Sequence, residues 1–351
     1  MKKINILAVG TDKKTFNLLF SKNYPSLIYE NKTFLREDRN IGMVNFKKRL
    51  KKNNFNILTL KEYKIKQKKI DFEFHFYSNV SPITKSKLYL ILPEHYLVDK
   101  NCKYSLIKKK YHKIFTNIKS HIDNKKFFFL NWPLSLKKKT KDYIKKKSSI
   151  CMIASNKTLQ SNSLKSGYPE RIKIIKWFKK NHPGNLSLYG KGWDRPIFVN
   201  YFLSKILNFI FRKLNIQMNL LKNEYKGTCV DKLDVLKKYN FTFCIENVLN
   251  EKGYNTGQIF DALKANSIPI YYGRPDINKS IPKDCYIDYK KFSNTDNLYS
   301  FIANIDKKIL TKYQKNIKQF CNQSIYDERS EFNEKNYSKI LIKHLKKDAK
   351  K

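Results

Sequence analysis

The chain has 351 residues, of which 41% are hydrophobic and 14% aromatic, and a formal net charge of +44 at pH 7. The apolar content excludes intrinsic disorder, and the length predicts two domains that each bury a core. The charge admits an anionic partner such as nucleic acid, a lipid surface or a phosphorylated substrate, but the lysines are spread through the whole chain, so we attribute most of them to overall composition. Without an RRM, KH or zinc-finger signature, nucleic acid is not the partner we expect.

Cysteine usage and hydropathy limit the cellular setting. The six cysteines form no CxxC pair, which argues against zinc and favours a reducing compartment. Cys151 and Cys244 lie in predicted buried strands, where cysteine behaves as a small hydrophobic residue. The start of the chain, MKKINILAVG, is too short an apolar run for a signal peptide, and no stretch is long enough to span a bilayer. We expect a cytoplasmic protein, at most peripheral at the inner face of the membrane.

The first half predicts an α/β domain, 1–146, in which short apolar segments form strands. In residues 70–76, apolar residues alternate with Asp71, Glu73 and His75, which is the period of a half-buried strand. The charged segment 137–147 predicts a helix or linker at the domain boundary. The other expected strands are residues 4–9, 88–92, 113–116 and 127–130.

The second half predicts another α/β domain, 147–330, followed by a basic helix and tail, 331–351. Expected strands are 150–154 and 186–189, and expected helices are 169–180, 298–309 and 335–345. Asp-x-Asp, HExxH and P-loop motifs do not occur in the sequence, so we expect no metal ion and no other required cofactor.

Residues 197–221, IFVNYFLSKILNFIFRKLNIQMNLL, combine apolar side chains with scattered cations. On a helix, Asn200, Ser204, Asn208 and Arg212 would fall on one narrow line, and most of the remaining circumference would be apolar. Two interpretations stay open. The favoured one is a helix buried between layers; the other is a basic interfacial helix in peripheral contact with a membrane.

The segment 239–273 has the strand, loop, helix, strand order of a parallel βαβ unit. Its first strand ends at Glu246 and Asn247, its helix begins near Asn255–Thr256, and residues 268–272 form its second strand. Ligands of open α/β sheets bind beyond the carboxyl ends of the strands, and a helix N-terminus favours anions. The polar residues between the strands therefore suit a phosphate-bearing ligand.

This segment resembles the donor-binding motif of the α-1,3/4-fucosyltransferases, glycosyltransferase family 10. The resemblance implies two Rossmann-like domains facing a cleft, the GT-B arrangement, with the donor in the second domain and the acceptor against the first. It covers about residues 150–292 and includes Arg171. The matching pieces in the segment are Tyr239–Phe241, Ile245–Asn247, Tyr254–Thr256, Ile259–Ala262 and Ile268–Gly273.

The resemblance implies an inverting glycosyltransferase that moves fucose, or a related sugar, from a GDP-sugar to a hydroxyl of a glycan acceptor. Such a transfer needs a base for the acceptor hydroxyl and cations or N–H groups for the departing diphosphate. By resemblance Glu94, after the strand 88–92, is the base; the alternative is an exposed turn residue. Arg171 is the candidate diphosphate clamp, because a guanidinium donates two parallel hydrogen bonds. The alternative for Arg171 is a surface arginine at a helix start.

The other candidates follow the strand that ends at Glu246. Asn247 could bond donor hydroxyls or phosphate, whereas Glu246 could contact a ribose or cap a neighbouring element, and Tyr254 could pack over the donor or belong to the core. The family's Glu-Lys pair is Gly257-Gln258 here, so a non-catalytic glycan- or nucleotide-binding relative is the alternative function. The donor-binding candidates are thus Arg171, Glu246, Asn247, Tyr254, Asn255, Thr256 and Gln258, with Lys232 and the upstream pair Glu251-Lys252 as further charged groups.

Overall fold

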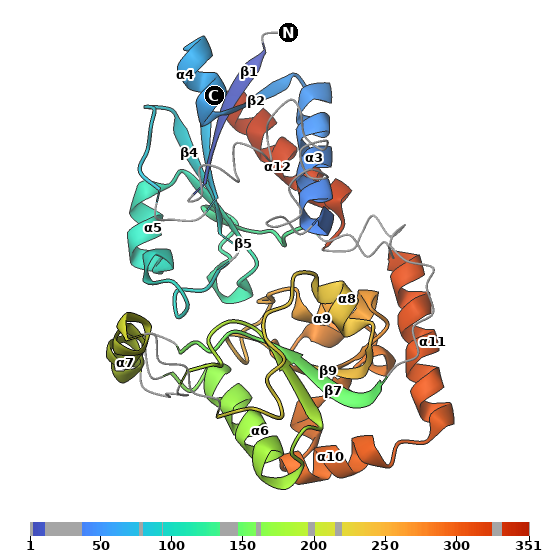
Figure 1. Cartoon of the computed structure of the whole chain (residues 1–351). Helices are drawn as coiled ribbons and strands as arrows, with labels where there is room; N and C mark the ends of the chain where they lie inside the picture. The colour runs from blue at the N-terminus through green and yellow to red at the C-terminus, as the bar shows by residue number, and fades with distance from the viewer. Residues whose placement is uncertain are drawn as a thin grey trace. The chain divides into compact units, whose positions relative to one another are not determined.

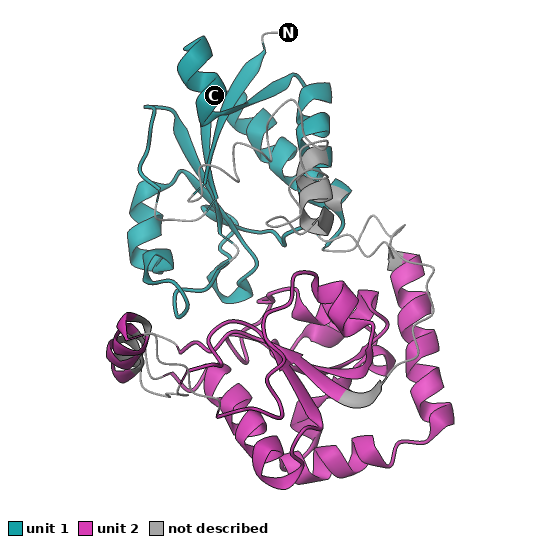
Figure 2. Ribbon diagram, in the orientation of Figure 1, with its two compact units in different colours: residues 1–135, 325–351 teal, residues 136–324 magenta. Residues whose placement is uncertain are grey.

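The computed structural model (Figure 1) describes residues 3–10, 37–76, 80–92, 94–133, 147–158, 163–195, 201–214, 220–324 and 332–350. The chain forms two compact units (Figure 2): unit 1 is Met1–Ser135 with Ile325–Lys351, and unit 2 is Leu136–Ser324. Each unit is built on one parallel sheet with helices, which confirms the predicted α/β class. Among the described residues, the helices are all too short or too polar to cross a membrane.

Unit 1 contains a six-stranded sheet in the order β2-β1-β3-β4-β5-β6, with all neighbouring strands parallel. Its strands are β1 (Ile4–Gly10), β2 (Phe55–Thr59), β3 (Phe72–Phe76), β4 (Lys87–Leu92), β5 (Lys113–Thr116) and β6 (Phe127–Phe129). Its helices are α3 (Glu37–Lys52), α4 (Leu60–Lys66), α5 (Tyr104–Lys110) and α12 (Glu334–Ala349), with short 3-10 turns η1 (Lys100–Cys102) and η2 (Lys119–His121).

The last helix of the chain, α12, completes the core of unit 1. Its apolar residues share a cluster with the sheet and α3. Near its end, the Asp348 carboxylate accepts a hydrogen bond from Lys113 Nζ of β5 at 2.8 Å and lies 3.1 Å from His112 Nε2. Because these partners come from β5 and its edge, the carboxylate fixes the helix against the sheet.

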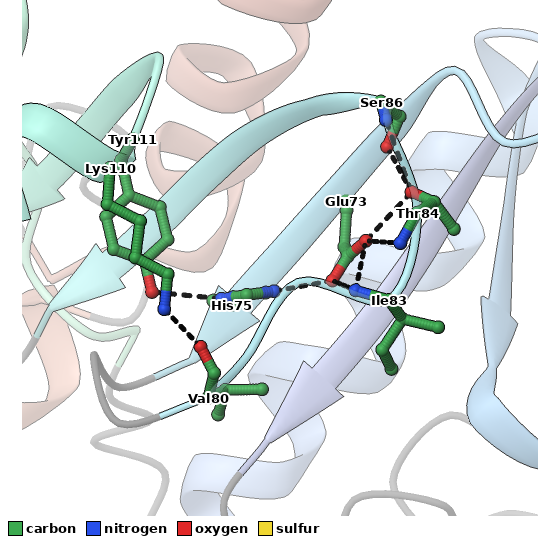
Figure 3. A network of polar contacts seen from close by, with 8 residues as sticks. All are labelled: Glu73, His75, Val80, Ile83, Thr84, Ser86, Lys110 and Tyr111. Atoms are coloured by element: carbon green, nitrogen blue, oxygen red, sulfur yellow. Dashed lines mark hydrogen bonds and ion pairs between the residues drawn. The ribbon is translucent and has the colours of Figure 1, made fainter.

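Strand β3 departs from the half-buried strand that its alternation predicted, because all five of its residues are buried. Figure 3 shows the reason: the polar side chains Glu73 and His75 lie under residues 80–86 and beside Tyr111. Glu73 accepts hydrogen bonds from the backbone N–H groups of Ile83 and Thr84, at 3.0 and 2.8 Å. Protein donors thus take the place of water on this face of the strand.

Unit 2 contains a five-stranded parallel sheet in the order β11-β10-β9-β7-β8. Its strands are β7 (Lys147–Ile153), β8 (Leu186–Tyr189), β9 (Tyr239–Ile245), β10 (Ile268–Tyr272) and β11 (Ile287–Asp288). Its helices are α6 (Tyr168–Asn181), α7 (Tyr201–Lys213), α8 (Lys232–Leu236), α9 (Gln258–Lys264), α10 (Thr295–Ala303) and α11 (Lys307–Ser324), with 3-10 turns η3 (Ile277–Lys279), η4 (Lys283–Cys285) and η5 (Tyr289–Lys291).

The central strands β9 and β10 of unit 2 are buried along most of their length, as expected for a parallel sheet covered on both faces. Cys151 of β7 and Cys244 of β9 are buried, as the sequence predicted. The helix expected over 298–309 is two helices, because α10 ends at Ala303 and α11 begins at Lys307. The predicted charged segment 137–147 lies, up to residue 146, outside the described residues.

Candidate functional site

The carboxyl ends of β9 and β10 lie side by side in unit 2. Ile245 pairs with Tyr272, and the backbone N–H of Glu246 donates to the Tyr272 carbonyl at 2.8 Å. Glu246 is fully buried, and its Oε2 accepts a hydrogen bond from the backbone N–H of Thr256 at 2.9 Å. The carboxylate therefore ties the loop between β9 and α9 back to the strand end.

Two glycines allow other segments to approach Glu246 closely. A Cβ added at Gly167, just before α6, would lie 1.9 Å from the Glu246 carbonyl oxygen. A Cβ at Gly273, just after β10, would lie 2.4 Å from Glu246 Cγ and equally close to the Tyr271 hydroxyl. Sequence reasoning missed the role of Gly167. Its signal is a glycine immediately before the Tyr-Pro pair that opens a helix, where a capping residue is usual.

Arg171 of α6 is buried against this strand end, so the alternative of a surface arginine is wrong. Its Nε donates to the Ile245 carbonyl at 3.1 Å, and its Nη2 donates to the same oxygen and, at 3.0 Å, to Asn247 Oδ1. Burial lowers the pKa of Arg171, while Tyr168, Glu246 and other neighbouring groups act to raise it. The guanidinium holds the last carbonyl of β9 and the amide beyond it; the diphosphate contact stays a prediction.

Asn247 is half-buried, and Arg171 determines how its amide is oriented. A guanidinium has donors only, so the amide oxygen must face it and Nδ2 must point elsewhere. The Asn247 backbone carbonyl accepts from the Gly167 N–H at 3.1 Å, which fixes the main chain as well. In the part of the chain that the structure describes, no protein acceptor is recorded for Nδ2. The arrangement presents one amide donor at the carboxyl end of β9.

The loop from Tyr254 to Gln258 differs from its prediction at the helix start. The chain enters α9 only at Gln258, because Gly257 has the left-handed backbone conformation (φ 82°), which cannot belong to the helix. Tyr254 is fully buried, whereas Asn255, Thr256 and Gln258 are partly exposed. The loop thus buries its tyrosine, whereas Asn255 and Gln258 stay partly accessible to solvent.

Two of the three extra charged groups of this region, Lys232 and Glu251, form ion pairs. Lys232 of α8 lies 3.8 Å from the Asp261 carboxylate of α9. The Glu251 carboxylate lies 2.9 Å from Lys165 Nζ, and Lys252 is exposed to solvent. Glu251 and Lys232 are therefore held by neighbours within unit 2.

A buried ion pair that sequence reasoning missed supports the same loop. Arg274 Nε and Nη2 donate to the two carboxylate oxygens of Asp276, at 2.7 and 2.9 Å. Asp276 Oδ1 also accepts from the Gly253 N–H at 3.1 Å, and the Arg274 N–H donates to the Tyr271 hydroxyl at 3.0 Å. The pair connects the loop to the end of β10. Its sequence signal, an arginine directly after Gly273 with an aspartate two residues on, is weak.

Comparison with known proteins identifies the family of the chain. The family model described as "Glycosyltransferase family 10 (fucosyltransferase) C-term" matches residues 143–349. The chain belongs to glycosyltransferase family 10. The match extends from just before β7 to the last residue of α12, and so contains every donor-side candidate.

The individual family 10 relatives align with only a short stretch of this chain. The α-(1,3)-fucosyltransferase FucT of Helicobacter pylori is 33% identical over 72 residues, which are 20% of this chain and 15% of that enzyme. The α-(1,4)-fucosyltransferase of Arabidopsis thaliana is 31% identical over 70 residues, 20% of this chain and 17% of that enzyme. The matched stretch is thus less than a fifth of either relative.

Solved structures show the same fold over nearly the whole chain. An α1,3-fucosyltransferase aligns over 100% of this chain and 90% of its own, with a TM-score of 0.52 and 14% identity. Anabaena HepE, solved with UDP and glucose, aligns over 98% of this chain and 100% of its own, with a TM-score of 0.53 and 10% identity. The likeness is one of fold, and it confirms the GT-B class for this family 10 chain.

The candidate base of this family 10 protein lies in unit 1. Glu94 follows β4 by two residues and is half-buried, and its Oε1 accepts from the N–H of His95 at 3.0 Å. His95 is buried, and its Nδ1 accepts from the Leu97 N–H at 3.1 Å, so the turn is held by side chain to backbone bonds. The described residues contain no group of three or more His, Cys, Asp or Glu side chains that could hold a metal ion.

Proposed function

We propose that the protein is an inverting glycosyltransferase that transfers fucose, or a related sugar, from a GDP-sugar to a hydroxyl of a glycan acceptor. The observation that carries this proposal is the family 10 match over residues 143–349. The names of the relatives, all fucosyltransferases or fucosyltransferase-like, support fucose as the sugar. The polar groups at the carboxyl ends of β9 and β10 also support the proposal, because open parallel sheets bind their ligands at this edge.

On the donor side, Asn247 donates from Nδ2 to a donor hydroxyl or phosphate oxygen. Arg171 is the cation of this edge: it orients the amide and its charge stabilises the departing diphosphate. Asn255, Thr256 and Gln258 line the rest of the donor site, with Gln258 donating a hydrogen bond where the family has lysine. Glu246 and Tyr254 act beneath them, since both are fully buried.

On the acceptor side, the Glu94 carboxylate accepts the proton of the acceptor hydroxyl. The hydroxyl oxygen forms the new bond to the anomeric carbon on the face opposite the diphosphate. The bond from that carbon to the GDP oxygen breaks with its electron pair, so the configuration inverts. The half-buried position of Glu94, just after the apolar strand β4, supports this role.

The first experiment measures the melting temperature of the full chain with GDP, GDP-fucose, GDP-mannose, UDP-sugars and dTDP-sugars. A ligand that binds only the folded state raises this temperature, so GDP and GDP-fucose should raise it, and UDP- and dTDP-sugars should not. Stabilisation by UDP- or dTDP-sugars alone would contradict a GDP-sugar donor.

The second experiment tests the base. Glu94→Gln should abolish sugar transfer while leaving the stabilisation by GDP unchanged. Glu62→Gln is the matched control, because Glu62 is a surface carboxylate of α4 and glutamine preserves its capping bond. Retained turnover in Glu94→Gln would show that another group is the base.

A second candidate function, a non-catalytic glycan- or nucleotide-binding relative, is favoured by Gly257-Gln258. Gln258 carries no charge, and the positive φ of Gly257 disfavours a glutamate there. Gln258→Lys alone therefore tests the alternative without backbone strain. A gain of transfer from no activity would identify a degenerate enzyme, whereas reduced transfer from an active parent would identify an enzyme adapted to glutamine.

A further inference from the structure

Helix α7 of unit 2 turns an apolar surface to solvent. Figure 1 shows α7 at the margin of unit 2, away from both faces of its sheet. The exposed fractions of its apolar side chains are 48% for Leu203, 43% for Ile206, 67% for Phe209 and 40% for Ile210, and 61% for Leu214 just after the helix. The favoured expectation, a helix buried between layers, is therefore wrong for these residues.

The exposed side chains belong to one face. Leu203, Ile206, Ile210 and Leu214 follow the three- and four-residue spacing of a single helix face, and Phe209 extends it. A surface helix of a globular domain normally turns its apolar face to the core, whereas an exposed apolar face is typical of a binding site for a partner protein or a membrane.

The charge of the segment identifies the chemistry of that partner. Helix α7 contains Lys205, Arg212 and Lys213, and no Asp or Glu occurs between residues 195 and 223. An apolar surface in a segment that carries cations and no acidic residue complements a surface with an apolar interior and anionic groups at its edge. A second copy of the chain would instead bring like charges together around the same face.

The length of the helix decides how it would meet a bilayer. Helix α7 has 13 residues, and at 1.5 Å per residue a helix of this length reaches about 20 Å, short of the ~30 Å hydrocarbon core. It cannot span the core, but it can lie in the interface with its apolar face inward and its cations at the headgroups. A phenylalanine such as Phe209 is typical of the apolar face of interfacial helices.

We propose that α7 is a membrane-surface anchor that binds bilayers with anionic headgroups through the face formed by Leu203, Ile206, Phe209, Ile210 and Leu214. The proposal does not depend on which sugar the protein transfers. It places α7 in the interface of a bilayer and not across it.

The test is co-sedimentation of the full chain with vesicles of phosphatidylcholine alone or with about a third phosphatidylglycerol. The double variant Phe209→Ser with Leu214→Ser removes the two most exposed side chains of the face and leaves every charge in place. The matched control is Leu164→Ser with Val230→Ser, because these side chains are 103% and 89% exposed elsewhere in unit 2. We expect the parent and the control to sediment with anionic vesicles. The partition coefficient of the α7 variant between these vesicles and solution should be at least tenfold lower.

Three results would overturn the proposal. Equal recovery of the parent with neutral and anionic vesicles removes the anionic surface as partner. Equal binding of the parent and the α7 variant shows attraction by overall charge alone. A lipid-free dimer that only the α7 variant abolishes, measured by sedimentation velocity, assigns the face to a second copy. Ile206→Trp supplies a second readout, since its fluorescence should shift to the blue with anionic vesicles only.

Discussion

Each unit contains a cluster of buried polar groups on or just after a central strand, and the two clusters differ in what they leave accessible. In unit 1, Glu73 and His75 of β3 are fully buried beneath residues 80–86 (Figure 3). In unit 2, Glu246 is buried just as deeply, but Asn247 beside it is half-exposed and keeps an amide donor. A sealed cluster stabilises the fold, whereas an open one can also bind a ligand.

The electrostatics of the sealed cluster support a structural role. Burial by itself would raise the pKa of the Glu73 carboxyl, but hydrogen bonds from His75, Ile83 and Thr84 outweigh it and lower that pKa. The same burial raises the pKa of the Tyr111 hydroxyl, which lies 2.9 Å from His75 Nδ1. The ionised carboxylate is thus the form that the surrounding donors require.

The largest expected effect on folding comes from Glu73→Gln. The amide removes the charge and turns a donor toward the N–H groups of Ile83 and Thr84, so the free energy of unfolding should fall by about 3–5 kcal/mol. Urea unfolding measures this loss, with Glu62→Gln as the surface control. A loss below about 1 kcal/mol would mean that residues 80–86 are held by their other contacts.

The lowered pKa of Glu73 also predicts how the free energy of unfolding depends on pH. The folded pKa of Glu73 lies below its ordinary value of 4.5, so the unfolded state binds more protons in that range. The stabilisation is complete above the unfolded pKa and is lost as the pH falls through the folded pKa. The parent should therefore lose stability below about pH 4.5 more steeply than Glu73→Gln. Identical slopes would assign the acid sensitivity to other carboxylates.

In unit 2 the largest expected effect comes from Gly167→Ala, since the new Cβ would meet the Glu246 carbonyl oxygen at 1.9 Å. Helix α6 must move away from β9, at a cost of about 3 kcal/mol, and Arg171 moves with it. The free energy of unfolding, measured in urea, and the affinity for GDP should both fall. Gly184→Ala is the control, because nothing lies within 4 Å of its added Cβ and only the positive φ of 82° opposes it. Equal costs for the two would rule out the steric contact.

Asn247→Ala separates binding from folding in the open cluster. The substitution removes one hydrogen-bond acceptor from the buried Arg171 guanidinium, which should lower the free energy of unfolding by about 2 kcal/mol. It also removes the amide donor of Asn247. We expect GDP affinity, measured by calorimetry, to fall at least tenfold. Asn240→Ala, at the opposite end of β9, is the control and should bind GDP as the parent does. An Asn247→Ala protein with reduced stability and normal affinity would make this cluster structural, like that of unit 1.

Local pattern predicted the strands well, because the buried parallel strands are short segments rich in apolar residues. Strands β5 and β8 have the predicted bounds, and the order β9, α9, β10 is as expected. The alternation in β3 predicted a half-buried strand, which is wrong. A polar face that is covered by protein donors has the same sequence pattern as one that is covered by water. Neither the burial of Arg171 nor the exposure of α7 could be deduced locally, since each depends on what a distant segment covers.

The smallest expected effect bears on the residue where this chain departs from its family. Gly257→Ala places a Cβ in the left-handed conformation (φ 82°) and should cost about 1 kcal/mol, as should Gly227→Ala at φ 84° in another loop. The two differ in their consequence for binding, because Gly257 determines where α9 begins and hence how Gln258 is presented. We expect weaker GDP binding for Gly257→Ala only. If instead both stability and affinity are unchanged, the loop can leave the left-handed conformation. The strain argument against a glutamate at position 257 then fails. The double variant Gly257→Glu with Gln258→Lys would in that case test whether the family's Glu-Lys pair can act in this chain.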